Sequence, residues 1–498
     1  MKGVTVKEIR GRITETVGSI LAGDSLRAKV FRGGVWLGGG STVEQAARLG
    51  RNMILTRLLA PQAFGTMAIV LSAASVLQSF TDIGVKEALV QNPNGRHDHY
   101  LNAAWWLAVG RAVLLAAALF AVAPFVASFY GNLELTGLLR LSTMGIILSG
   151  ASSPRAYVAI KDMNFGKWAT VTNAGGICGV VLTVALGFGI RDVWALAIGS
   201  CAESAARCAL SYILFPHIPP LAWNKEAARD LMRFSRGLLG ISFLNLIFSR
   251  ADIFVLAKLY SPAALGLYTM GILLVQTPTS FVMNMLGQTF LPALSQVQDD
   301  ALRTNRILLR VARAIALLTL PALAFVFFCA RPLLTLIYGP NYAIAAMPLI
   351  LACCVAIFNV QNGQFTLVFY ASGRPRLHRL CVIIMAVMVA GLMYPLSRWL
   401  GFAGSQLACL TAIAAGFLFQ LVRAHHLTKL NVSEYASSYF LPALVSLSVV
   451  AICLVARPFE ALVRPLPSVI VGIVGCVFAY SFSALAVLRN NHKLRVGS

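Results

Sequence analysis

The stretch RLLAPQAFG at residues 57–65 recurs as KLYSPAALG at residues 258–266, an offset of 201 residues. Leucine, proline, alanine and glycine keep their places, and the leading arginine is replaced by lysine. Each copy follows a long apolar run and closes the first helix of a group. An even number of predicted helices separates the copies, so the two halves have the same membrane orientation and are related by an axis along the membrane normal.

The sequence around this repeat is strongly apolar. Of its 498 residues, 58% are apolar and 12% are charged, with a mean hydropathy of +0.76. Soluble proteins are roughly 45 to 50% apolar and about 25% charged. The composition therefore excludes a soluble multidomain enzyme and predicts a polytopic helical membrane protein.

Apolar run length and flanking breakers predict about fourteen transmembrane helices in an all-α fold. The predicted spans are 33–56, 63–84, 102–129, 137–160, 168–190, 193–215, 237–257, 264–289, 311–337, 343–371, 379–398, 402–424, 438–456 and 468–488. We predict two pseudo-symmetric six-helix bundles, 33–215 and 237–424, followed by two C-terminal helices within 425–488. The remaining segments are a basic N-terminal arm (1–32), a linker (216–236) and a tail (489–498), all cytoplasmic.

Basic residues outnumber acidic ones by 41 to 18, a balance that could also indicate nucleic-acid binding. With the N-terminus inside, about 27 basic residues fall in cytoplasmic segments and about 8 in the opposite loops. This asymmetry predicts that both termini are cytoplasmic, and it explains the charge without nucleic acid. The basic, amphipathic end of the linker is typical of a segment on an anionic leaflet.

Charged residues inside predicted spans are costly, so they usually face a partner or a wet cavity. In the first span, Ser41, Glu44, Arg48 and Arg51 lie at spacings of three and four, which places them on one face. At the matching positions of the seventh span lie the side chains of Asn245, Ser249, Asp252 and, turned by about 100°, Arg250. We predict that the two polar faces line a shared axis.

The arginines within the predicted spans indicate which kind of cargo the protein carries. Arg111 lies about ten residues into its span, or ~15 Å deep, where it cannot easily reach the surface. Arg51 and Arg250 lie nearer the outer end and could instead reach lipid headgroups. A cavity with several arginines and few acids selects anions, and the guanidinium fork suits phosphate oxygens.

Other polar residues have roles that the sequence leaves open. Asn359, Gln361, Asn362 and Gln364 either touch sugar hydroxyls or bond neighbouring helices. Glu203 and Arg207, four residues apart, are interpreted as a structural ion pair. The ten cysteines fall within predicted spans with no CxxC, so we predict no metal, cofactor or disulfide framework. The predicted substrate-binding residues are Arg48, Arg51, Arg111, Arg250, Asn245, Asp252, Asn359 and Asn362.

Five stretches, taken in order, resemble one family. They are RLLAPQAFG, TDIGVKEALVQNP (81–93), SRADIFVLAKLYSPAALGLY (249–268), FLPALSQVQDD (290–300) and YGPNYAIAAMPL (338–349). The chain resembles the polysaccharide exporters, the lipopolysaccharide and exopolysaccharide flippases of the multidrug, oligosaccharidyl-lipid and polysaccharide transporter superfamily.

The resemblance implies a flippase that moves undecaprenyl-pyrophosphate-linked oligosaccharide units across the bacterial inner membrane by alternating access. Its arginines would hold the pyrophosphate, and the lipid tail would stay in the bilayer, with the two C-terminal helices a candidate place for it. The implied partners are the lipid-linked oligosaccharide, membrane lipids, a polysaccharide polymerase and chain-length proteins. The charged pair Glu44 and Arg48 departs from the less charged first helix expected in many members.

Three other function classes fit the sequence less well. A cation-coupled drug exporter of the same superfamily would need a coupling carboxylate, and only Glu44 and Asp252 offer one within these faces. A membrane glycosyltransferase or polymerase would need a large outer loop with paired acids, whereas the predicted outer loops are short. An ATP-driven pump is disfavoured because the sequence has no GxxxxGK[ST] loop.

Overall fold

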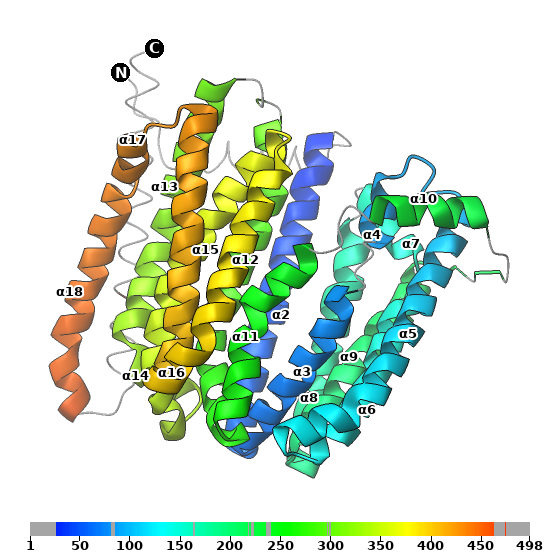
Figure 1. Ribbon diagram of the computed structural model, residues 1–498, viewed down its shortest axis with the longest axis horizontal. Coiled ribbons are helices and arrows are strands. Elements are labelled where there is room, and N and C mark those ends of the chain that lie inside the picture. The colour runs from blue at the N-terminus through cyan, green and yellow to red at the C-terminus, as the bar shows by residue number, and fades with distance from the viewer. Residues whose placement is uncertain are drawn as a thin grey trace, which may run out of the picture. The chain divides into compact units, whose positions relative to one another are not determined.

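The computed structural model describes residues 26–80, 85–162, 165–217, 219–220, 224–235, 241–295, 297, 300–462 and 474. This part of the chain is helical and contains no strand, which confirms the predicted all-α fold (Figure 1). Eight of its helices are long and apolar enough to cross a membrane, or nine if one bent pair forms a single span. The span predicted at 468–488 lies outside the described residues except for residue 474. The total of fourteen therefore stays a prediction.

The chain divides into two compact units. Unit 1 comprises Met1–Leu59 and Ala73–Ser242, and unit 2 comprises Ala60–Ser72 and Phe243–Ser498. The helices of unit 1 are α2 (Leu26–Leu58), α4 (Val85–Gln91), α5 (Asp98–Tyr130), α6 (Glu134–Gly150), α7 (Arg155–Lys161), α8 (Phe165–Ile190), α9 (Val193–Leu214) and α10 (Lys225–Ser235). Helix α3 (Pro61–Phe80) begins in unit 2 and ends in unit 1.

Unit 1 is a row of long helices in which α8 packs against both α2 and α9, α9 against α6, and α6 against α5. The short amphipathic helix α10 lies across the end of α5 (Figure 1). Its apolar residues Ala227, Ala228 and Leu231 are buried against α4 and α5. Because α4 and α5 occupy this apolar face, it cannot also enter a lipid leaflet. The exposed face of α10 carries both basic and acidic residues, Lys225, Arg229 and Arg233 beside Glu226 and Asp230.

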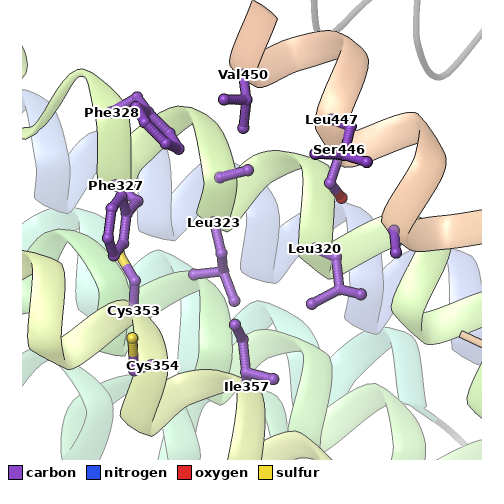
Figure 2. Close-up of a pocket in the computed structure, with 12 residues that line it drawn as sticks. Leu320, Leu323, Phe327, Phe328, Cys353, Cys354, Ile357, Ser446, Leu447 and Val450 are labelled. Atoms are coloured by element: carbon purple, nitrogen blue, oxygen red, sulfur yellow. The ribbon is translucent and has the colours of Figure 1, made fainter. Parts of the chain in front are cut away.

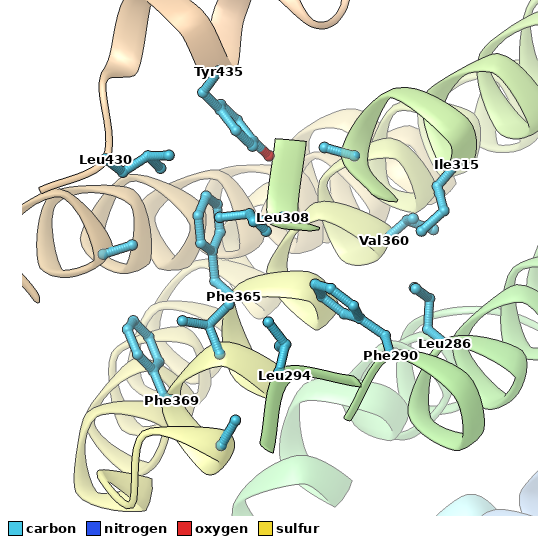
Figure 3. Packing of buried hydrophobic residues seen from close by; sticks show 14 residues of the cluster. Leu286, Phe290, Leu294, Leu308, Ile315, Val360, Phe365, Phe369, Leu430 and Tyr435 are labelled. Atoms are coloured by element: carbon cyan, nitrogen blue, oxygen red, sulfur yellow. The ribbon is translucent and has the colours of Figure 1, made fainter. Parts of the chain in front are cut away.

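Unit 2 contains α11 (Ile241–Leu259), α12 (Pro262–Ser295), α13 (Ala301–Phe328), α14 (Ala330–Ile337), the 3-10 helix η1 (Pro340–Ala345), α15 (Ala346–Ala371), α16 (Pro375–Thr428), α17 (Val432–Ser437) and α18 (Phe440–Leu462). Its largest described apolar cluster joins α12, α13 and α15 and is closed by Leu430 and Tyr435 (Figure 3). Phe365 and Phe369 of α15 are fully buried within it. The close van der Waals packing of such side chains fixes the register of these helices.

Two predicted spans are interrupted in the structure, and one predicted break between spans is present as a kink. The predicted span 137–160 is broken into α6 and α7, which meet at a bend of 56°. Pro154 lies at this break, and its missing N–H and its ring prevent the helix from continuing. The predicted span 311–337 is divided at Cys329, whose backbone leaves the helical region. The predicted break near residue 400 is present as a kink in α16, where Gly401 adopts a φ of 64°.

The two copies of the repeated turn pack directly against each other. Each copy starts a helix with proline in its first turn, Pro61 in α3 and Pro262 in α12. A Cβ added to Gly65 would lie 1.8 Å from the carbonyl oxygen of Pro262, and one added to Gly266 would lie 1.8 Å from that of Pro61. The contact is reciprocal, as expected for a pseudo-twofold relation, and only glycine allows the two backbones to approach this closely.

Candidate functional site

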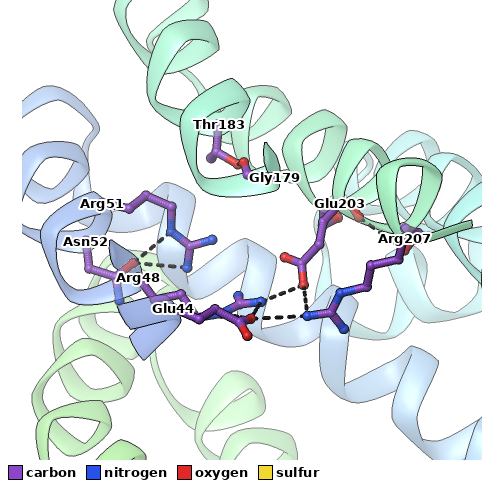
Figure 4. A network of polar contacts seen from close by, with 10 residues as sticks. Glu44, Arg48, Arg51, Asn52, Gly179, Thr183, Glu203 and Arg207 are labelled. Carbon is purple, nitrogen blue, oxygen red and sulfur yellow. Dashed lines mark hydrogen bonds and ion pairs between the residues drawn. The ribbon is translucent and has the colours of Figure 1, made fainter. Parts of the chain in front are cut away.

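Unit 1 contains a network of charged side chains from α2 and α9. Glu44 and Arg48 come from α2, and Glu203 and Arg207 come from α9, each pair one helical turn apart (Figure 4). Arg48 Nη2 lies 2.8 Å from Glu44 Oε1 and 2.5 Å from Glu203 Oε1. Arg207 Nη2 lies 3.1 Å and 2.9 Å from the same two oxygens. Positive and negative groups therefore alternate, and each carboxylate oxygen is shared by two guanidinium groups.

Glycines of α8 make room for this network. A Cβ on Gly176 would lie 2.3 Å from Glu44 Oε1, and one on Gly179 would lie 2.5 Å from the Cβ of Glu203. A Cβ on Gly175 would lie 2.3 Å from Arg207 Cγ. Small residues at such spacing let helices in a membrane approach closely. The sequence AGGICG at 174–179 thus places α2 and α9 on either side of α8 at a distance that lets their charged groups meet.

A third arginine adjoins the network. Arg51 donates to Asn52 Oδ1 from Nε and Nη2 at 3.2 and 3.1 Å. It lies within electrostatic range of Arg48 and Glu203. Three arginines and two glutamates leave the cluster with one net positive charge. In the low-dielectric interior of a membrane protein, such a site favours an anion over a cation.

Part of this cluster was predictable from the sequence. Helical spacing places Glu44, Arg48 and Arg51 on one face of the first helix, and it pairs Glu203 with Arg207, an ion pair that the structure confirms at 2.9 Å. The joining of the two pairs across α8 was not predicted. The available signal was the closely spaced glycines of α8, which indicate a close helix contact.

The remaining predicted residue of unit 1, Arg111, lies on α5. Its Nη2 donates to the backbone carbonyl oxygen of Gln78 at 3.2 Å. Residue 111 lies thirteen residues from the start of α5, or ~20 Å along the helix. Its position is therefore deep within a long apolar helix, as the sequence predicted.

Asp252 of α11 is the most buried of the predicted residues in unit 2. Its Oδ2 accepts a hydrogen bond from the Tyr268 hydroxyl at 2.7 Å, and that hydroxyl in turn accepts from Gln406 Nε2 at 2.6 Å and from Ser405 Oγ at 3.2 Å. Asn245, on the same helix, is exposed. The polar stripe predicted on this helix thus includes one residue that is bonded inward to Tyr268 of α12, whose hydroxyl is also bonded by α16. Tyr268 and Gln406 were not among the predicted residues.

The polar run of α15 bonds neighbouring helices. Asn362 Nδ2 donates to the carbonyl oxygen of Ile413 in α16 at 3.1 Å. Gln361 Oε1 accepts from the Tyr435 hydroxyl at 2.9 Å and from Gln364 at 3.2 Å. The Oδ1 atom of Asn362 is buried and accepts no hydrogen bond in the described part of the chain. The sequence left two roles open for this run. The structure shows hydrogen bonds to neighbouring helices, and contact with sugar hydroxyls stays a prediction.

A polar cavity of about 420 Å³ lies in unit 1, lined by Asp98, Asn102, Arg155, Pro216, His217 and Pro220. His217 Nε2 lies 3.0 Å from Asn102 Oδ1. Burial lowers the pKa of His217 from its ordinary value of 6.5, and the nearby Arg155 lowers this pKa further, with Asp98 opposing them. The imidazole is therefore held neutral at pH 7.

This shift predicts an acid-dependent loss of stability. Below pH 6.5 the unfolded chain binds a proton at His217 before the folded chain does, so the free energy of unfolding falls between 6.5 and the lower folded pKa. His217→Gln keeps a polar group beside Asn102 but cannot titrate. We expect the melting temperature of the wild type to fall more than that of this variant between about pH 7.5 and 5. Equal slopes for the two proteins would contradict the assignment.

A family model described as polysaccharide biosynthesis protein matches residues 54–347. The chain belongs to this family. The chain is similar to the succinoglycan biosynthesis transport protein ExoT of Rhizobium meliloti, 24% identical over 59% of each chain. The lipopolysaccharide biosynthesis protein WzxC of Escherichia coli is 20% identical over 70% of this chain and 71% of its own. The resemblance drawn from the five sequence stretches is thereby confirmed.

Solved structures of two membrane transporters share the fold of this chain. The lipid II flippase MurJ, in an inward closed conformation, aligns with a TM-score of 0.70 at 11% identity, covering 90% of this chain and 98% of that one. An inward-facing multidrug resistance MATE family transporter of the MOP superfamily aligns with a TM-score of 0.53 at 16% identity, covering 78% and 96%. At these identities the likeness establishes the fold alone.

Proposed function

We propose that the protein flips an undecaprenyl-pyrophosphate-linked oligosaccharide unit from the cytoplasmic to the outer face of a bacterial inner membrane, by alternating access, for surface polysaccharide synthesis. The observation that carries the proposal is the arginine-rich network of unit 1 in a multi-pass member of the polysaccharide biosynthesis family. A membrane protein retains such charges where they act on a charged cargo or partner. A polymerase and chain-length proteins would then act on the flipped product.

The headgroup of this cargo accounts for the predicted site residues. Arg48, Arg51, Arg111 and Arg250 would donate to the pyrophosphate oxygens, for which charge-assisted guanidinium hydrogen bonds are well suited. The amides of Asn245, Asn359 and Asn362 would meet sugar hydroxyls. Asp252, already bonded to Tyr268, would hold the polar face of α11 in place.

An apolar cavity in unit 2 supports a lipid-linked cargo. It has a volume of about 530 Å³ and lies between α13, α15 and α18. Leucine and phenylalanine side chains such as Leu320, Phe327 and Leu447 point into it (Figure 2). Its lining suits an isoprenoid chain and offers nothing to a charged headgroup. Helix α18 corresponds to the first of the two C-terminal helices predicted from the sequence.

The second candidate is a cation-coupled small-molecule exporter of the same superfamily. The observation that favours it is Asp252, a buried carboxylate of α11 that accepts a hydrogen bond from Tyr268 of α12. Export of a cationic drug would require this charge, whereas the arginines of unit 1 would repel the cargo.

Depletion of the protein in its host tests these two functions. Lipid-linked intermediates are measured by mass spectrometry, and their sidedness is measured with a membrane-impermeant reagent. We expect an undecaprenyl-pyrophosphate oligosaccharide to accumulate on the cytoplasmic face. Normal surface polysaccharide without accumulation, together with increased drug sensitivity, would instead support the exporter.

Arg111 and Arg250 offer a residue-level prediction. We expect Arg111→Gln and Arg250→Gln each to lower the rate of polysaccharide export by about tenfold or more, because each removes a charge-assisted hydrogen bond to the cargo. Export is measured as surface polysaccharide per unit of membrane-inserted protein. Arg229→Gln, on the exposed face of α10, is the matched control and should export normally. Wild-type export by both variants would remove these two arginines from the proposed site.

The predicted topology is tested by cysteine labelling. Cysteines introduced at Leu58 and Leu259, the matching positions of the repeat, should both react with an impermeant maleimide added outside the inner membrane. Labelling is scored as the gain over the wild-type chain. A cysteine at Arg229 should react only after the membrane is opened. Labelling of Leu58 and Leu259 variants from opposite sides would contradict the parallel arrangement of the two halves.

A further inference from the structure

The two glutamates of the network occupy the place that an anionic ligand of the arginines would take. Glu44 Oε1 and Glu203 Oε1 each lie within 3.1 Å of both Arg48 Nη2 and Arg207 Nη2. Figure 4 shows the two carboxylates between the two guanidinium groups. A diphosphate carries several anionic oxygens on two linked groups, and such oxygens accept hydrogen bonds from the same donors.

The arginines are the more accessible members of the network. The side chains of Arg48 and Arg207 are 26% and 38% exposed, whereas those of Glu44 and Glu203 are 12% and 17% exposed. An incoming ligand therefore meets the arginine side chains before the carboxylates. The carboxylates lie behind them, against the glycines of α8.

One arginine retains an unused donor. The Nε atom of Arg207 is buried and has no hydrogen-bond partner within the described residues. A guanidinium group binds a phosphate best through two parallel N–H groups, and Nε with Nη2 forms one such fork. The glutamates thus leave part of the anion-binding capacity of Arg207 unoccupied.

We propose that Glu44 and Glu203 are internal anions, which the diphosphate group of the cargo displaces from Arg48 and Arg207. This inference rests on the proposed function. Without cargo, the carboxylates neutralise the two arginines inside the membrane, where an unpaired charge is costly. With cargo, the diphosphate bridges Arg48 and Arg207, and Glu203 is left beside Arg51, with which it already interacts. Competition by the carboxylates keeps the affinity low enough for the cargo to be released.

The proposal predicts whether each of four substitutions strengthens or weakens diphosphate binding. Glu44→Gln and Glu203→Gln remove a competitor while keeping the size of the side chain, so they should strengthen diphosphate binding. Arg48→Gln and Arg207→Gln remove a donor and should weaken it. A network that only holds α2 and α9 together would lose binding, or leave it unchanged, in all four variants.

The test measures binding of inorganic pyrophosphate to the full-length protein in lipid nanodiscs by titration calorimetry at fixed ionic strength. We expect Glu44→Gln and Glu203→Gln each to lower the Kd by about tenfold or more, and the arginine variants to raise it by a similar factor. Asp162→Asn is the matched control, because it removes an acid from the exposed pair with Arg96 in the same unit. Its Kd should equal that of the wild type.

Thermal unfolding of each sample shows which variants are folded. One folded glutamate variant is enough to show whether the Kd for pyrophosphate falls or rises. Unchanged or weaker binding in the folded glutamate variants overturns the inference, as does the absence of pyrophosphate binding in every protein. If the glutamate variants bind tightly but depletion causes no lipid-linked glycan to accumulate, the diphosphate site stands and the proposed function fails. If glycan accumulates but the glutamate variants do not lower the Kd for pyrophosphate, only this inference fails.

Discussion

Arg48→Gln is expected to lower the free energy of unfolding by about 3 kcal/mol and to abolish polysaccharide export. The substitution leaves Glu44 and Glu203, both largely buried, sharing Arg207 as their one arginine within the network. Removing one partner of a buried ion pair typically costs about 3–5 kcal/mol, and partial exposure places this site at the lower end. The loss is measured as a fall in melting temperature of the purified protein and as the amount of surface polysaccharide.

A compensating variant separates stability from transport. Glu44→Gln combined with Arg48→Gln removes the whole pair from α2 and leaves the Glu203 and Arg207 pair balanced, at 2.9 Å. We expect this double variant to recover most of the stability lost by Arg48→Gln and still to fail in export. Arg96→Gln, which breaks an ion pair whose partners are 60% and 43% exposed, should cost less than about 1 kcal/mol. Full export by the stable double variant would show that the network is structural.

The parts of this network that the sequence predicts are those that lie within one helix. Spacings of three and four residues place Glu44 beside Arg48, and the same rule pairs Glu203 with Arg207. The joining of the two pairs depends on how closely α2 and α9 approach α8, a distance set by the packing of Gly176 and Gly179. Periodicity within a helix carries no information on this distance.

The fold also divides into features that are visible within one helix of the sequence and features that depend on packing between helices. Apolar run length predicts where helices lie in the chain, because a membrane selects for that property directly. The break at Pro154 had a sequence signal, since proline interrupts the helical hydrogen bonds. The break at Cys329 had a similar signal, because Pro332 lacks the N–H that would continue the hydrogen bonds of α13 into α14. The partner of Asp252 had no such signal, because Tyr268 lies in the next helix and meets Asp252 only after α11 and α12 pack.

The reciprocal glycine contact gives the second large effect. Gly65→Ala and Gly266→Ala are each expected to lower the free energy of unfolding by about 3 kcal/mol or more and to abolish export. In each case the new methyl group would meet a backbone carbonyl oxygen at 1.8 Å, and neither backbone can move aside without separating the start of α3 from α12. Gly391→Ala in α16 is the matched control, since its added Cβ meets nothing within 4 Å. That variant should be neutral or slightly stabilised, because alanine favours a helix over glycine.

The double variant tests whether the two contacts are one interface. Once Gly65→Ala has pushed the two helix starts apart, Gly266→Ala meets a contact that is already open, so the second substitution should cost much less than the first. Thermal unfolding of the wild type, both single variants and the double variant gives this coupling. Additive losses would mean that each glycine is needed for a separate reason, and the repeated turns would then not act as a single pseudo-symmetric contact. A strong coupling would mean that residues 57–65 and 258–266 were retained as a pair because each provides the space that the other fills.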